Sequence, residues 1–310
     1  MESLQNLKTR QGAVRNVGKI TKAMEVVSAT KMRKAQETAL SARPYALEAL
    51  RMLYIITRFV PGTSFFTEAR EVGRTLYVVI ASDRGLAGAF NAQIFRTCDV
   101  LLRQDQTSCA ALAVGKKAER YLAHKNLSPV AVFSGFGDTA RYEEVEPLAE
   151  CIVEGFRARL WDRAVTVSTH FRTTLKQEVL VRYILPTSAE KIQATIEEII
   201  PEHGRFADLA VRLPSGSRTA KNIAYILEPS PEQILDELVP YLVRMQLYHI
   251  ILEANASEHS ARRVAMKTAS DNADELAGTL TLAYNKARQA IITKEIIEIT
   301  GTQTALESLS

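Results

Sequence analysis

The sequence predicts an α/β protein with long α extensions: an antiparallel coiled coil of the N- and C-terminal helices, plus a small Rossmann-like doubly wound α/β domain. Three observations predict it. Apolar residues recur at helical spacing near the N-terminus, strand-length apolar runs alternate with helical segments in the middle, and small apolar residues repeat every three or four positions near the C-terminus. We therefore expect a coiled-coil helix over 1–60, a Rossmann-like base domain over 72–228, and a second coiled-coil helix over 230–306 that pairs with the first.

The N-terminal helix is expected from about residue 3 to residue 59, because Ala, Lys, Met, Gln and Glu favour helix. Its apolar stripe consists of Val14, Val17, Ile20, Met24 and Val27. The first 43 residues also hold nine Lys and Arg against three Glu, whereas the whole chain has a net charge of only +4. The stripe then drifts to Met32, so we expect irregular supercoiling rather than strict heptads, and we expect Pro44 to kink or interrupt the helix.

The middle of the chain follows a strand–helix alternation after a linker over 60–71. Apolar strands are expected at 75–81, 110–114, 130–133, 164–168 and 178–185. Helices are expected between them at 91–103, 116–125 and 143–160. Such an alternation predicts a mostly parallel sheet that is covered on both faces. Residues 187–222 predict a short helical piece followed by an irregular loop.

The C-terminal helix begins with a recognisable signal. Ser230 can cap the helix, Pro231 suits its first position, and Gln233 can complete a capping box. The chain then reads as helical to about Leu306, with Pro240 as an early irregularity. Its expected seam, at alternating spacings of three and four, consists of Ala273, Leu276, Leu280, Ala283, Ala287 and Ala290. The N-terminal helix is the expected partner.

Several classes of chemistry are not expected. The sequence has no apolar run long enough to span a membrane and no signal or transit peptide pattern. Its three cysteines lack CxxC spacing, which favours buried thiols in a reducing compartment. Gly85 and Gly88 give GxxG rather than the dinucleotide fingerprint. We therefore expect no catalytic residues, no bound cofactor and no metal site.

Five segments carry a resemblance to a known family. They read KITKAMEVVSATKMRKAQ (19–36), SARPYA (41–46), SDRGLAGAFN (82–91), ASEHSARRVAMKTASDNADEL (256–276) and YNKARQAIITKEIIEI (284–299). In this order they resemble the gamma subunits of the F-type ATP synthase, whose members form the central rotor shaft. The resemblance covers nearly the whole chain except about 187–222. That stretch has no cysteine pair, so the thiol switch of plant chloroplast members is not expected.

The resemblance implies a mechanical function. The chain would be a non-catalytic subunit of a proton-translocating ATP synthase (sodium drives some members) that couples rotation of the membrane c-ring to ATP synthesis or hydrolysis. The implied partners are three alpha and three beta subunits, the epsilon subunit and the c-ring. It also implies peripheral attachment, through other subunits, to the cytoplasmic face of a bacterial cell membrane, and no nucleic acid.

The resemblance also implies subunit-contact residues. Met24, Arg262 and Gln289 match positions where the shaft meets the beta-subunit catch, and Arg288 lies beside Gln289. Lys22, Lys31, Arg33 and Lys34 are candidate charges for an acidic beta lever, while Asp83 and Arg84 would fix the shape of the 82–91 turn. A helix end that is apolar on several faces needs an enclosing sleeve, so a bearing is expected at Ile291, Ile292, Ile296, Ile297 and Ile299. Seam packing for Met24 and a solvated helix face for the four cations remain as alternatives.

Two other functions also fit the sequence. The basic N-terminal arm also fits a nucleic-acid-binding coiled coil, although it has no aromatic residue before Tyr45 on which bases could stack. The middle domain also fits a Rossmann-like nucleotide-binding enzyme with a coiled-coil arm.

Overall fold

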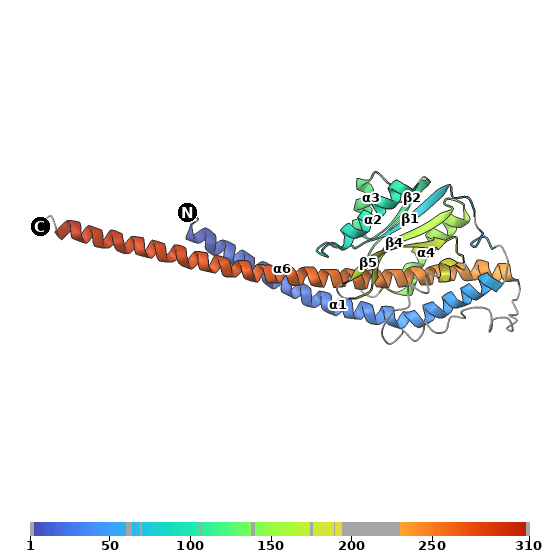
Figure 1. Cartoon of the computed structure of the whole chain (residues 1–310), viewed down its shortest axis with the longest axis horizontal. Helices are drawn as coiled ribbons and strands as arrows, with labels where there is room; N and C mark the ends of the chain where they lie inside the picture. Colours follow the sequence, from blue (N-terminus) through green and yellow to red (C-terminus); the bar gives the residue numbers. More distant parts are fainter. Residues whose placement is uncertain are drawn as a thin grey trace. The chain divides into compact units, whose positions relative to one another are not determined.

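The computed structural model describes residues 3–59, 64–68, 70–105, 107–137, 140–173, 176–188, 190–193 and 230–307. The chain forms two compact units: unit 1 consists of Met1–Ser28 and Arg263–Ser310, and unit 2 of Ala29–Arg262. Helices α1 (Leu4–Phe59) and α6 (Pro231–Glu307) contribute residues to both units (Figure 1). The three-part domain division stays a prediction, and most of the predicted helical piece and loop over 187–222 lies outside the described residues.

Both long helices are continuous. Helix α1 passes through Pro44, and α6 passes through Pro240. The expected interruption at Pro44 is therefore wrong, because a proline removes one hydrogen bond from a helix that has many others on either side. At the start of α6, the Gln233 backbone N–H donates to Ser230 Oγ at 3.3 Å, which confirms the predicted cap.

Unit 1 is an antiparallel helix pair. Gln11 Nε2 donates to Thr281 Oγ1 at 2.5 Å, and a Cβ on Gly18 would lie 3.3 Å from Ala273 Cβ. Residue numbers therefore increase along α1 in the direction in which they decrease along α6. The inward positions of α1 are Leu7, Gln11, Val14, Gly18, Thr21 and Ser28. Those of α6 are Met266, Ser270, Ala273, Ala277 and Leu280. Both series fit a strict heptad pattern, so the expected drift of the stripe is wrong.

The apolar stripe predicted on α1 is only partly the seam. Val17, Ile20 and Val27 are 53%, 60% and 52% exposed, and on α6 Leu276 is 46% exposed. These seam assignments are therefore wrong. The reason is the close approach at Gly18 and Ala273, because small side chains bring the backbones together and direct the bulkier neighbours outward.

Unit 2 contains a five-stranded sheet in the order β3-β2-β1-β4-β5 (Figure 1). Its strands are β1 (Arg74–Ile80), β2 (Ser108–Val114), β3 (Val132–Phe133), β4 (Arg163–Phe171) and β5 (Gln177–Leu185). The first four are parallel, and β5 runs antiparallel to β4. The mostly parallel sheet is thus confirmed, although β3 is shorter and β4 longer than expected.

Helices cover both faces of this sheet, as predicted. Helices α2 (Phe90–Gln104) and α3 (Lys116–His124) pack on the face formed by Tyr77 and Val79. Helix α4 (Tyr142–Arg157) packs on the opposite face, together with the unit 2 segments of α1 and α6. The alternation of strand side chains between two apolar cores explains why β1 reads as one continuous apolar run.

One close contact limits the packing of α4. The Trp161 indole is 2% exposed, and its N–H donates to the Ile152 carbonyl at 3.1 Å. A Cβ on Gly155 would lie 2.0 Å from that ring. Only glycine therefore fits at position 155 without moving the indole.

A buried charge cluster joins α6 to the sheet within unit 2. The Glu253 carboxylate lies 2.8 Å from His170 Nδ1 on β4, 3.2 Å from Arg182 Nη2 on β5, and 3.1 Å from His249 Nε2. Burial alone would raise the pKa of Glu253, but the charge of His249, the hydrogen bonds of both histidines and the charge of Arg182 hold it well below its usual value. The carboxylate is therefore ionised inside the core.

Candidate subunit-interaction sites

The predicted contact residues fall into two groups, one in each unit. In unit 1 they are Lys22, Met24, Arg288, Gln289 and the five isoleucines of the bearing. In unit 2 they are Lys31, Arg33, Lys34, Asp83, Arg84 and Arg262. Each group is brought together on its own elements.

In unit 1 the polar candidates lie on the outside of the helix pair. Lys22 Nζ pairs with Glu25 at 2.9 Å, and this hydrogen bond and the charge of Glu25 raise the pKa of Lys22. Arg288 and Gln289 are exposed. Met24 is half-buried, so it both packs toward the seam and reaches the surface.

The five isoleucines of the expected bearing are also exposed. Their exposed fractions run from 43% at Ile291 to 68% at Ile299. Large apolar side chains on several faces of one helix leave an apolar surface that needs a cover. Nothing within the described residues encloses them.

Within unit 2, one part of α1 presents basic side chains. Arg33 and Lys34 are exposed, whereas their neighbours Met32 and Ala35 are buried, and Lys31 is half-buried. The heptad spacing thus directs the two cations away from the packed side of the helix.

The glycine-containing turn at 82–89 follows β1 and is held by Asp83. One carboxylate oxygen accepts the N–H of Lys116 at 3.0 Å, and the other accepts the N–H of Gly135 at 2.9 Å. Asp83 thereby ties together the ends of three parallel strands. These bonds connect Asp83 to two neighbouring loops, and its role in fixing the shape of the 82–91 turn stays a prediction.

This arrangement weighs against the nucleotide-binding alternative. In Rossmann-like sheets, phosphate binds at a helix N-terminus beyond the carboxyl ends of the strands. Here the carboxylate of Asp83 already accepts the N–H of Lys116, the first residue of α3. A phosphate at that helix would meet a negative charge. No cluster of metal-binding side chains occurs among the described residues.

Arg262 is buried, with 7% of its surface exposed. Its guanidinium donates to the carbonyls of Arg84 at 3.3 Å and Gly85 at 3.2 Å, and it pairs with Glu258 at 2.5 Å. The structure therefore joins Arg262 to the 82–89 turn. A direct bond from Arg262 to another subunit stays a prediction.

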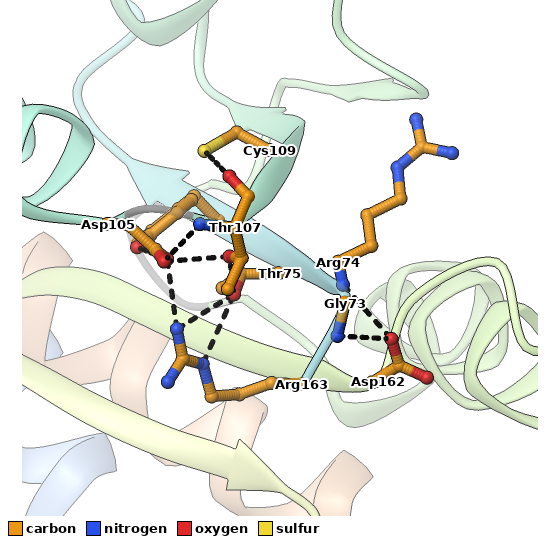
Figure 2. Close-up of polar contacts among 9 residues, drawn as sticks. Gly73, Arg74, Thr75, Asp105, Thr107, Cys109, Asp162 and Arg163 are labelled. Carbon is orange, nitrogen blue, oxygen red and sulfur yellow. Dashed lines mark hydrogen bonds and ion pairs between the residues drawn. The ribbon is translucent and has the colours of Figure 1, made fainter. Parts of the chain in front are cut away.

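A polar cluster at the amino ends of the strands, opposite the end where Asp83 lies, was not expected from the sequence. Figure 2 shows Arg163 reaching Asp105, at 2.9 Å, and Thr75. Burial alone would raise the pKa of Asp105. Hydrogen bonds from Tyr77, Thr107 and Thr75 outweigh burial and lower that pKa. Asp162 also accepts the backbone N–H groups of residues 73 and 74 (Figure 2). These bonds brace strand starts, and no spacing rule links residues so far apart in the chain.

The three cysteines differ in burial. Cys98 is buried as expected, and burial raises the pKa of its thiol to about 12. Cys109 and Cys151 are half-buried, and burial also raises the pKa of each thiol. All three are free thiols. Among the described helices, none has a stretch both long and apolar enough for a membrane span.

Comparisons with known proteins give a consistent result. The model of a family described as ATP synthase matches residues 3–306. Among curated relatives, the ATP synthase gamma chain of Opitutus terrae is 37% identical over 309 residues, covering 99% of this chain and 100% of that one. The gamma chain of Salinibacter ruber is 33% identical over 321 residues and covers 99% of both.

Solved structures share the fold. The rotor of the Euglena gracilis mitochondrial ATP synthase gives a TM-score of 0.60 at 17% identity, covering 93% of this chain and 98% of that chain. The central stalk and c-ring structure from Tetrahymena thermophila mitochondria gives 0.59 at 20% identity, covering 81% and 99%. At these identities the likeness concerns the fold alone.

Proposed function

The chain belongs to the ATP synthase gamma-chain family, and from this premise we propose that it is the central-stalk rotor subunit of a proton-translocating ATP synthase. It carries no active site of its own. It couples rotation of the membrane c-ring to ATP synthesis or hydrolysis at the beta subunits. It works as a peripheral protein at the cytoplasmic face of a bacterial membrane, held there by the epsilon subunit and the c-ring.

The observation that carries this proposal is the exposed apolar surface of unit 1. Its seam is lined by residues as small as Gly18 and Ala273, while Ile20 and Leu282 are 60% and 73% exposed. Exposed apolar side chains do not stabilise an isolated helix pair, so they favour a surface that other subunits cover. A ring of three alpha and three beta subunits around the pair would supply that cover.

The exposed charges of α1 suit a rotor subunit, whose surface must move past the surrounding subunits. Exposed ion pairs contribute about 0–1 kcal/mol each, so they form and break readily as a shaft turns. Lys22, Arg33 and Lys34 are exposed and would meet acidic side chains of the beta subunits in turn. Gln289 and Arg288 would add hydrogen bonds at the catch.

The exposed isoleucines from Ile291 to Ile299 suit a bearing. Apolar contacts have no preferred direction, so a sleeve around them would hold the helix end without locking its rotation. Met24, half-buried, contributes to the seam and to the proposed catch at once.

Reconstitution tests the proposal. The full chain is mixed with separately purified alpha and beta subunits, and ATP hydrolysis is measured with the chain alone, the other subunits alone, and the mixture. We expect no turnover from the chain alone and a stimulated rate in the mixture. A correctly folded chain that neither joins the complex nor changes its rate would refute the rotor assignment.

A matched pair of variants tests the catch. Gln289→Ala removes a proposed contact, whereas Asn285→Ala, one helical turn earlier and also exposed, removes a polar side chain outside the proposed set. We expect Gln289→Ala to lower turnover of the assembled complex several-fold and Asn285→Ala to leave it unchanged. Equal rates for the two variants would remove Gln289 from the catch.

A further inference from the structure

Within unit 2, helix α6 contacts the sheet through two kinds of side chain. One kind is the buried ionic cluster of Glu253 with His170 on β4, Arg182 on β5 and His249 one turn earlier in α6. The other kind belongs to the apolar core on the same face of the sheet and includes Leu242, Val243, Leu247, Ile250 and Ile251. The two kinds of contact resist different movements of the helix.

The apolar contacts hold α6 against the sheet but define its position along its own axis only weakly. Apolar attraction has no preferred direction. A slip by one helical turn moves α6 by about 5.4 Å and brings the residue three or four positions away to each site. At Leu247 the incoming residue would be Ile250 or Ile251, and exchanges between apolar side chains of similar size cost little.

The ionic cluster does not allow such a slip. A slip in one direction would bring Ala256 or Ser257 to the place of Glu253, and a slip in the other would bring His249 or Ile250. None of these four residues carries a carboxylate. Arg182, whose side chain is 4% exposed, would lose its buried counterion, which is strongly destabilising in a protein core.

The cluster attaches α6 to two strands at once. His170 Nδ1 and Arg182 Nη2 both lie within 3.2 Å of one oxygen of Glu253, and the other oxygen faces His249. Strand side chains alternate between faces, so His170 and Arg182 face α6, whereas Val181 packs on the opposite core. Strands β4 and β5 are paired from Ala164 to Phe171, so the attachment point is a continuous part of the sheet.

We propose that the Glu253 cluster is a register lock, which prevents α6 from sliding over the sheet when the helix carries torque. The torque in this inference rests on the proposed function, since a rotor must transmit force between the sheet and a helix that continues into unit 1. The lock itself belongs to unit 2 and is tested on the chain alone. It gives the buried charges a mechanical function in addition to their effect on stability.

The first test removes the lock without leaving a charge unpaired. The triple variant His170→Leu, Arg182→Met and Glu253→Leu replaces the ionic partners by apolar side chains, a change that often preserves stability. The matched control is Arg244→Met with Glu146→Gln. It removes an ion pair of 2.5 Å that also joins α6 to the base, through α4, but has side chains 25% and 40% exposed.

The register of α6 is measured on the full-length chain by double electron–electron resonance. Spin labels are attached at Glu237→Cys on α6 and Gln93→Cys on α2, which are exposed positions of unit 2, after the three native cysteines are replaced by alanine. We expect one narrow distance in the parent and in the control. In the triple variant we expect a distribution broadened by up to about 5 Å, the rise of one turn, and a urea midpoint no lower than that of the parent.

Two results of this test overturn the lock. A triple variant as narrow as the parent shows that the apolar contacts alone fix the helix, and equal broadening in the control shows that an exposed ion pair does the same. If the triple variant fails to fold, Glu253→Gln takes its place, because it keeps the shape of the side chain and removes the charge. It should broaden the distance in the same direction, and an unchanged distance overturns the lock.

The second test applies a load. The complex is reassembled with its membrane sector in phospholipid vesicles, and two quantities are measured: ATP hydrolysis without a proton gradient, and the largest gradient that ATP-driven pumping reaches. We expect the triple variant to hydrolyse ATP at the parent rate and to reach a gradient several-fold smaller, because slip occurs under torque. An equal gradient, or a loss of assembly and hydrolysis together, overturns the mechanical role.

Failure of the proposed function looks different from failure of this inference. A folded parent chain that does not restore ATP-driven pumping overturns the rotor assignment, while the distance measurement on the chain alone still decides whether the cluster fixes the register. A working parent beside a triple variant with the same register and the same gradient overturns the lock and leaves the rotor assignment standing.

Discussion

The two units of this chain differ in how completely they bury their large apolar side chains. Unit 2 buries its large residues, with Trp161 and Phe156 at 2% and 0% exposed, and glycine appears where the ring needs space. Unit 1 buries Leu7, Met266 and Leu280 together with the small Gly18, Thr21 and Ser28, and it leaves other large apolar side chains, such as Ile20 and Leu282, outside. Unit 2 is therefore stabilised mainly by its own apolar core, whereas the seam of unit 1 sets a short distance between two helices.

Polar groups show the same difference. In unit 2 the carboxylate of Glu253 is buried among His170, Arg182 and His249. In unit 1 the exposed Lys22 pairs with Glu25, whose side chain is half-buried, so water reaches the ion pair from the Lys22 side. In unit 2 a buried ion-pair cluster connects α6 to the sheet, whereas the Lys22 charge of unit 1 lies on the outside of the helix pair.

The largest expected effect is at Gly155. Replacing it with alanine places a methyl group within the Trp161 ring contact, because the Cβ would lie 2.0 Å from the indole. We expect a loss of about 4 kcal/mol or more in the free energy of unfolding, measured in urea. Gly12→Ala is the control: its Cβ meets nothing within 4 Å, so it should gain up to about 1 kcal/mol from helix propensity. Similar stabilities for both variants would contradict the tight core of unit 2.

The next effect is at the buried charge cluster. Glu253→Ala leaves Arg182 without its carboxylate, so we expect a loss of about 3–5 kcal/mol in unfolding free energy at pH 7. Because the folded pKa of Glu253 is held below its usual value of 4.5, ionisation stabilises the fold above that pH. The advantage of the parent over Glu253→Gln should shrink as the pH falls below about 4.5. A difference that is constant from pH 7 to pH 3 would exclude a lowered pKa of Glu253 in the folded chain.

A smaller effect is expected in the seam of unit 1. Gly18→Ala adds a methyl group 3.3 Å from Ala273 Cβ, which forces the helices apart by a few tenths of an ångström. The strain outweighs the gain in helix propensity, and we expect a net loss of about 1 kcal/mol, measured as thermal or urea unfolding. An equal gain for Gly18→Ala and Gly12→Ala would show that close approach does not limit this pair.

The smallest effect on stability is expected at the exposed stripe. Ile20→Ser changes a side chain that is 60% exposed, and the two residue types have similar helix propensity. We expect the unfolding free energy to change by less than about 0.5 kcal/mol, while association with alpha and beta subunits weakens several-fold. If Ile20→Ser instead destabilises the isolated chain by about 2 kcal/mol, the side chain belongs to a core and the comparison between the units fails.

Sequence patterns located the candidate sites better than they described their contacts. Periodicity placed Lys22, Arg33 and Lys34 on helix surfaces, and the structure has them exposed. The family resemblance implied Arg262 as a subunit-contact residue and gave no internal partner for it, whereas its guanidinium is bound to the 82–89 turn. That partner lies about 180 residues earlier in the chain, so no local pattern could indicate it.

The sequence by itself determined the two long helices, the alternation that gives a mostly parallel sheet, and the family. These follow from local propensity, from periodicity and from short motifs, all of which act over a few turns of chain. Only the tertiary structure decided which side of α1 faces α6, because Val17 and Gly18 lie about 100° apart on one helix and either could face inward. The close approach of two backbones placed the glycine in the seam, and it left Val17, Ile20 and Leu276 on the surface.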